Sequence, residues 1–237
     1  MVILFSSITS SYEAFLRQKM DKKKHIIFLL TLFGGFCDAS TFILLGIFSG
    51  HITGNSVLIM VYLVERNWIM FIYCSISLLT FLSGTVLGSL LRLYFQAYNS
   101  YLPVIPLLFL QAILLISGSV LWLADSCIGF IVCQSLSMGL QNGVIMNICD
   151  IKIHTTYISG MSTTLVNSLF KGQTTDKKML QRILSVEIFC FIAGALAGGL
   201  LVSSFAAKGM YFSLPLLFIS GIITYRNNYS VNTKNKL

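Results

Sequence analysis

Residues 68–93 read WIMFIYCSISLLTFLSGTVLGSLLRL, and Arg92 is the one charged residue among them. A bilayer-spanning helix needs about 20 consecutive apolar residues, so a stretch of this length and composition is typical of a membrane span. Apolar side chains occur all around the helix that it would form, which leaves no polar side for water. The stretch therefore predicts a membrane protein.

The same composition extends over most of the chain. Of its 237 residues, 56% are hydrophobic and 10% are charged, whereas soluble domains carry about 25% charged residues. The other long apolar segments are residues 25–48, 103–123, 128–149, 183–207 and 210–225, and two short ones are residues 52–64 and 155–170. We predict an all-α, polytopic transmembrane helical bundle with six long spans plus two short or half-helices.

Two parts of the sequence resemble each other at a nearly constant spacing. Residues 81–91, FLSGTVLGSLL, match residues 191–201, FIAGALAGGLL, at an offset of 110. Other matches follow in the same order: residues 106–110 with 215–219, Thr53-Gly54 with Ser159-Gly160, and Asp38 with Asn142. We therefore predict a single transmembrane domain, residues 25–225, made of two repeats at about 25–124 and 125–225. Residues 1–24 and 226–237 are expected to be a cytoplasmic lead-in and tail.

The net charge of +8 is concentrated near the chain ends and in one loop, with basic residues grouped in 19–24, 171–182 and 226–236. This distribution is typical of cytoplasmic anchoring and predicts that both termini are cytoplasmic. It offers no continuous basic surface, so nucleic acid is excluded as a partner. Charge does not decide whether the short segments cross the membrane. If they cross, there are eight spans and parallel repeats; if they enter and return, there are six spans and inverted repeats.

Asp38 lies deep in the first predicted span. An acid at the bilayer centre costs about 2.5–3.5 kcal/mol on insertion scales, so it should face the protein interior. One interpretation is a carboxylate that couples to a proton or cation, or that accepts hydrogen bonds from the neighbouring short segment. The other is a structural acid that caps a broken helix end.

The two short segments begin with polar residues, and these complete the candidate site. A helix that begins inside the membrane presents partial positive charge to an anion or polar solute. Short or interrupted segments in corresponding positions of two repeats are also the best sequence indication of a transport site. The candidate substrate- or ion-binding residues are Asp38, His51, Thr53, Gly54, Asn55, Gln141, Asn142, Thr155, Thr156, Ser159 and Gly160.

Other polar or small residues receive structural interpretations. Gly84, Gly88, Gly194 and Gly198 form two GxxxG patterns, which favour close helix packing. Glu187 is placed near the start of its span, at the membrane interface. The three histidines are far apart and the six cysteines form no C-x-x-C pair, so we expect no metal site, no cofactor and no enzymatic activity.

The polar landmarks resemble a known family. Residues 35–39 (GFCDA), 51–55 (HITGN), 138–142 (MGLQN) and 155–160 (TTYISG) occur in the order found in the YoaK-like bacterial transmembrane proteins, a family of unknown function. The resemblance covers roughly residues 26–225. Gly143 stands where the family more often has alanine, and Ser159 where it more often has threonine. The resemblance implies about six spans and a location in the bacterial cytoplasmic (inner) membrane.

From these observations we predict a small-solute secondary transporter or permease with a polar site between its repeats. The alternative is a non-transporting membrane scaffold or regulatory protein that binds a partner or lipid. The expected partners are the lipid bilayer and a small polar or ionic solute, and a homo-oligomer is compatible with the sequence. Substrate, coupling ion and direction are not encoded in any motif.

Overall fold

The computed structural model describes residues 2–96, 104–144, 146–148, 151–153, 158–170 and 175–234, and it describes side chains for 24–95, 104–144, 158–170 and 178–227. These residues are almost wholly helical, as the sequence predicts. The helices are α1 (Val2–Leu45), α2 (Ile52–Val64), α3 (Trp68–Gln96), α4 (Val104–Leu123), α5 (Cys127–Gly143), α6 (Ile158–Phe170), α7 (Thr175–Phe205), the 3-10 helix η1 (Ala206–Ser213) and α8 (Leu214–Lys234).

The predicted long segment at residues 128–149 is shorter as a helix. Helix α5 ends at Gly143, and a small antiparallel hairpin of β1 (Met146–Ile148) and β2 (Ile151–Ile153) follows it. Two of the three residues of β2 and one of the three of β1 are isoleucine, whose branched side chain suits a strand better than a helix. Apart from this hairpin, the described chain conforms to the helical prediction.

Among the described residues, four segments are long and apolar enough to cross a bilayer: Lys24–Leu45, Trp68–Phe95, Val104–Leu123 and Lys178–Asn227, the last of which covers most of α7 and of α8. Helix α5 has 17 residues. The short helices α2 and α6 have 13 residues each, or about 20 Å at the usual rise per residue. A hydrocarbon core of about 30 Å is longer than either short helix.

The directions of the helices follow from their contacts. Helices α1 and α7 run parallel, because Gly194 packs on the backbone of Leu32 and Gly198, one turn later, packs on that of Phe36. Helices α3 and α5 are parallel in the same way, with Gly84 on Leu136.

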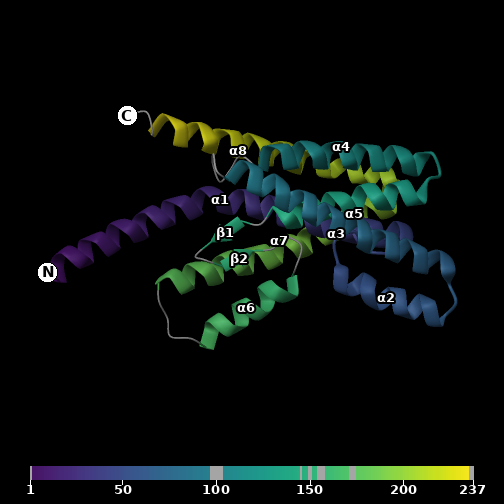
Figure 1. The fold of residues 1–237 in the computed structure, drawn as a ribbon, viewed down its shortest axis with the longest axis horizontal. Coiled ribbons are helices and arrows are strands. Elements are labelled where there is room, and N and C mark those ends of the chain that lie inside the picture. Colours follow the sequence, from purple (N-terminus) through teal and green to yellow (C-terminus); the bar gives the residue numbers. More distant parts are fainter. Residues whose placement is uncertain are drawn as a thin grey trace.

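Helices α1 and α5 run in opposite directions. Gly50, which is bonded to Asp38, lies against Met138, whereas Gln141, further along α5, reaches back to Leu30. Since α3 is parallel to α5 and α7 is parallel to α1, α3 and α7 are also antiparallel to each other. The two chain ends lie at the same end of the bundle (Figure 1).

Helix α1 ends where Gly46 adopts a positive φ of 71°, a conformation that glycine reaches without strain. The chain then turns back, since the Gly50 amide bonds to Asp38, seven residues before the end of α1. Helix α2 therefore begins at the level of Asp38 and leads outward again to α3. Because α1 and α3 run antiparallel, the segment between them starts and finishes at one end of the molecule. Figure 1 shows α2 beside the right-hand part of the bundle and α6 beside the left-hand part.

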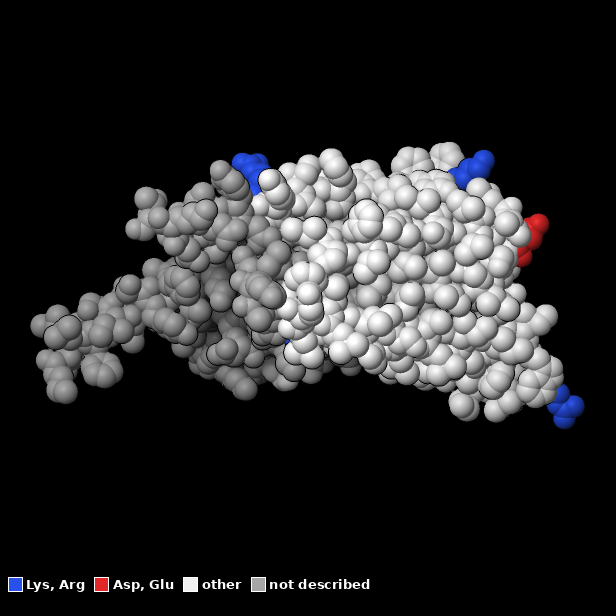
Figure 2. Space-filling model, turned by 45° about the horizontal axis from the view of Figure 1, so that its top comes forward, with Lys and Arg blue, Asp and Glu red and all other residues white. Residues whose placement is uncertain are grey.

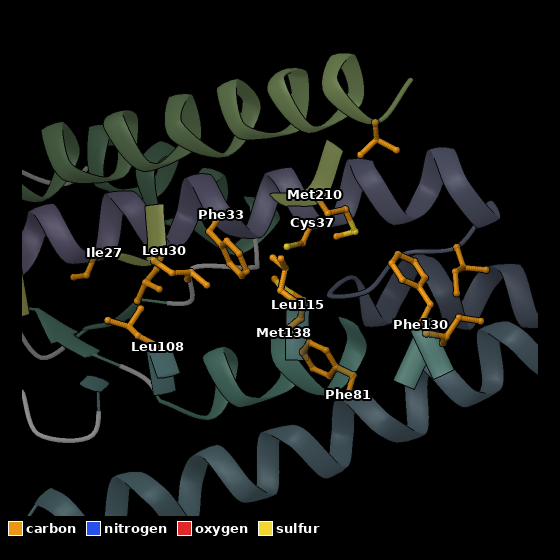
Figure 3. Close-up of a cluster of buried hydrophobic side chains, with 14 of the residues drawn as sticks. Ile27, Leu30, Phe33, Cys37, Phe81, Leu108, Leu115, Phe130, Met138 and Met210 are labelled. Carbon is orange, nitrogen blue, oxygen red and sulfur yellow. The ribbon is translucent and has the colours of Figure 1, made fainter. Parts of the chain in front are cut away.

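The core lies where α1, α3, α4, α5 and η1 meet (Figure 3). Phe33 from α1, Leu115 from α4 and Phe130 and Met138 from α5 are fully buried there. Large apolar side chains also point outward, among them Phe189, Leu196 and Phe218. On the face in Figure 2, the coloured Lys, Arg, Asp and Glu residues lie near the border of the grey part and at the opposite end, and the surface between these two places is white. An uncharged belt with exposed apolar residues is the surface that a lipid bilayer requires.

Candidate functional site

Asp38 lies in α1 beside the loop that returns from its end. The side chain is only 4% exposed, and its Oδ1 accepts hydrogen bonds from the Gly50 amide at 2.6 Å and from Ser49 Oγ at 3.2 Å. The second oxygen, Oδ2, is buried and has no hydrogen-bond partner. The carboxyl group thus orders the start of the short segment with one oxygen and leaves the other available for a proton, a cation or a solute donor.

Asn55 holds the same loop from the opposite side. Its Oδ1 accepts from the Phe48 amide at 3.0 Å, and its Nδ2 donates to the Phe48 carbonyl at 2.6 Å and to Ser77 Oγ at 3.0 Å. Ser77 in α3 is in turn hydrogen-bonded to Ser135 in α5 at 2.8 Å. The first turn of α2 is therefore tied to α3 and α5 through buried polar contacts, which fix its position in the helical bundle.

The remaining residues of the first short segment have smaller roles. His51 precedes α2, makes no side-chain cap and packs its ring against Phe48 at a centroid distance of 5.5 Å. Gly54 lies against the same ring, because an added Cβ would come within 2.9 Å of it. Thr53 is exposed on the outer side of the helix. Of the four residues predicted here, Asn55 is the one that is buried.

Gln141 is buried, and its hydrogen bonds lead away from Asp38. Its Nε2 donates to the Leu30 carbonyl at 2.9 Å and its Oε1 accepts from Gln111 Nε2 at 2.8 Å, so it joins α1, α4 and α5. Leu30 lies eight residues before Asp38 on the same helix, or about 12 Å along its axis. Asn142 is half-buried.

In the second short segment, Thr155 and Thr156 lie outside the described residues. Ser159 is exposed and Gly160 is half-buried, and their carbonyls accept hydrogen bonds from Thr163 and Thr164 inside α6. Helix α6 is held to α7 by a 3.0 Å hydrogen bond from Gln181 Nε2 to the Ser168 carbonyl. In the part that the structure describes, α6 therefore packs on α7 and does not join the Asp38 cluster.

The four glycines of the GxxxG patterns are packing residues. A Cβ at Gly84 or Gly88 would collide with the backbone of α5, and one at Gly194 or Gly198 with the backbone of α1. These contacts let each helix pair approach backbone to backbone, which is how small residues stabilise helices in lipid.

Two of the larger buried polar side chains are not among the predicted site residues. Glu187 was expected at the membrane interface, but it is fully buried at 0% exposure and neither carboxylate oxygen has a hydrogen-bond partner. Gln134 in α5 is 1% exposed and its amide is equally unpartnered. The offset of 110 between the repeats could have identified Glu187, since it aligns that residue with the buried Ser77. Within the described residues, no three His, Cys, Asp or Glu side chains gather as metal ligands would.

The fold and the cluster around Asp38 define a helical membrane-type protein with an internal acid. Comparison with protein families gives a match over residues 26–223 to the family described as "Protein of unknown function (DUF1275)". The chain belongs to this family, which agrees with the predicted membership in a family of unknown function. The YoaK-like name is not part of that match. No curated protein and no solved structure shows significant similarity to the chain.

Proposed function

We propose that this protein is a small secondary transporter or permease, and that its polar or ionic solute binds beside Asp38. The observation that carries the proposal is the buried Oδ2 of Asp38, which lacks a partner next to a helix that begins within the bundle. An ionisable group inside a membrane is costly and usually marks a pathway for a solute, ion or proton. Bonds from Gly50 and Ser49 orient the carboxyl group while Oδ2 stays available.

For the topology, we infer six spans, with α2 and α6 as half-helices, and two repeats of opposite orientation. The packing supports the duplication: Gly84 on Leu136 corresponds to Gly194 on Leu32, and Gly139 on Phe81 corresponds to Gly35 on Phe191. In both cases the numbers of the corresponding residues differ by 104 between α1 and α5 and by 110 between α3 and α7. Because α3 and α7 run antiparallel, the repeats are related by inversion, as in many secondary transporters.

We further infer that the end carrying both termini faces the bacterial cytoplasm. Arg66 and Lys208 lie in the α2–α3 turn and in η1, at the end away from the termini. The other basic residues with described side chains lie near the opposite helix ends: Lys24, Arg92, Lys178, Arg182 and Arg226. This asymmetry favours a cytoplasmic location for the end that carries the termini.

The transport proposal is tested with purified protein in liposomes that contain a pH-sensitive dye. A panel of amino acids, sugars, organic acids and inorganic ions is added outside, and solute uptake and proton movement are recorded. We expect uptake of a member of this panel, and its loss in Asp38→Asn while the variant stays folded. Asp125→Asn, the same change in the exposed α4–α5 turn, is the matched control and should retain uptake. Unchanged flux in both Asp38→Asn and Asn55→Ala would remove the site assignment.

A second candidate is the non-transporting scaffold or regulator, and one feature favours it. An open groove of about 560 Å³ lies between α4 and α8, lined by Leu108, Phe109, Ala112, Leu214, Leu217, Phe218, Gly221, Ile222 and Tyr225. An apolar groove on a lipid-facing surface suits an acyl chain or an apolar helix. Under this alternative no solute moves, and Leu217→Trp in the groove alters association with the partner, whereas Asp38→Asn leaves that association unchanged.

A further inference from the structure

Glu187 in α7 is a buried acid that the proposed solute site does not use. Its side chain is 0% exposed and both of its oxygens lack hydrogen-bond partners. Thr31 in α1 is also 0% exposed, and its hydroxyl is unpartnered as well. Other described residues also have buried polar atoms without partners, but Glu187 is the acid among them whose two oxygens both lack one, and this is the most costly case if the group is ionised.

The helix register places these two residues opposite each other. Gly35 of α1 packs on the backbone of Phe191 in α7, and Thr31 and Glu187 lie four residues, about one turn, earlier on the two parallel helices.

The second parallel pair, α3 and α5, shows which side-chain contact this register produces. Gly139 of α5 packs on Phe81 of α3, and the residues four positions earlier, Ser135 and Ser77, are hydrogen-bonded at 2.8 Å. Thr31 and Glu187 occupy the equivalent positions in the α1–α7 pair, with an acid in place of a serine.

Among the side chains that the structure describes, none supplies Glu187 with a compensating cation. On α7 its nearest ionisable neighbour is Cys190, and Arg182 is exposed. On α1, Lys24 and His25 precede Thr31 by nearly two turns, while Lys208 and Tyr211 of η1 follow the far end of α7. Helix α6, the other helix packed on α7, contains no ionisable residue. An ionised carboxylate without donors or a cation is strongly disfavoured in such a place, whereas a protonated one donates a hydrogen bond.

We propose that Glu187, with Thr31 beside it, is a proton-binding site in the half of the membrane nearer the termini. Thr31 and Asp38 lie seven residues apart on α1, about 10 Å along its axis, on either side of the middle of the Lys24–Leu45 span. The Glu187 carboxylate takes a proton from water on one side of the membrane and releases it to water again when it deprotonates. In the protonated form, the Glu187 carboxyl group donates a hydrogen bond to the Thr31 hydroxyl. The further step, that this proton drives solute movement past Asp38, rests on the proposed function.

Infrared spectroscopy of the full chain in lipid nanodiscs tests proton binding without any transport. A protonated buried carboxylic acid gives a carbonyl band that is separate from those of carboxylates and amides. At neutral pH we expect such a band, its loss in Glu187→Gln, and its retention in Glu65→Gln, the matched change at an exposed acid. Thr31→Val should shift the band, since the acid loses its hydrogen-bond acceptor. Alkaline pH should remove the band, and heavy water should shift it.

Isotope labelling keeps the test valid if Glu187→Gln fails to fold. The chain has three glutamates, so carboxyl-¹³C glutamate in the unaltered protein should move the band while labelled aspartate should not. Absence of a protonated glutamate band at neutral pH, or a band that neither titrates nor exchanges in heavy water, would overturn the proposal.

The liposome assay separates this inference from the proposed function. Absence of uptake by the wild-type protein contradicts transport and leaves the infrared result intact. Solute-coupled proton movement that is unchanged in Glu187→Gln contradicts the coupling role of Glu187 and leaves transport intact. We expect Glu187→Gln to lose the proton movement.

Discussion

The backbone amide of Gly50 donates a 2.6 Å hydrogen bond to Oδ1 of Asp38, twelve residues earlier in the chain. This bond joins the interior of α1 to the residue that precedes the N-cap of α2. It explains how a helix can begin inside the bundle, since the returning loop has a buried acceptor for its polar groups. The acid that is the leading candidate for solute binding is therefore also a structural anchor.

The two roles of Asp38 can be separated by substitution. Asp38→Asn keeps an oxygen at the Oδ1 position, so we expect its unfolding free energy to stay within about 1 kcal/mol of wild type. Asp38→Ala leaves the Gly50 amide and the Ser49 hydroxyl without their acceptor and should cost about 1–3 kcal/mol. Reversible unfolding in mixed detergent micelles measures both. Equal stability of the alanine variant and wild type would show that the anchor is unimportant.

Asn55 should control the position of the loop before α2. Asn55→Ala removes three hydrogen bonds to Phe48 and Ser77, and we expect a loss of about 1–2 kcal/mol together with faster proteolysis at residues 46–51. Ser56→Ala is the matched control, because its hydroxyl bonds only to the Ile52 carbonyl in its own helix. If both variants are cleaved at the same rate, Asn55 does not hold the loop.

The glycine contacts predict a contrast within one helix. Gly194→Ala in α7 places a methyl group against the backbone of Leu32, so α1 and α7 must separate, at a cost of about 1–3 kcal/mol. Gly199→Ala should be neutral or stabilising, because its Cβ would meet only the end of the Ile43 side chain at 3.4 Å. Thermal unfolding in detergent compares the two. The packing assignment fails if Gly199→Ala is the more damaging change.

The inferred topology makes a prediction about the α4–α5 turn. Alkaline phosphatase fused after Asp125 should be active, because six spans place that turn outside the cytoplasm, whereas a fusion after Lys178 should be inactive. Fluorescent protein fusions at the same positions should give the opposite signals. A cytoplasmic reporter after Asp125 would instead require eight spans.

Much of the fold could be predicted from the sequence. Residues 68–93 are too long and too apolar for a soluble protein, and the GxxxG patterns at Gly84 and Gly194 indicate close packing on helical neighbours. The candidate acid Asp38 was identifiable for the same reason, since a charge within an apolar segment is costly and therefore has a role. The hairpin after Gly143 could not be predicted, because a short apolar stretch that continues a helical segment does not by its periodicity distinguish a strand from a helix.

Composition and spacing thus determined the membrane environment, the helical segments and the polar residues worth attention, because the bilayer penalises each polar group individually. Only the tertiary structure decided which of those residues meet. It paired α1 with α7 and α3 with α5, brought Gly50 back to Asp38, directed Gln141 to Leu30, and buried Glu187 beside α1. These pairings depend on helix direction and register between distant segments, and local hydrophobicity carries no information about either.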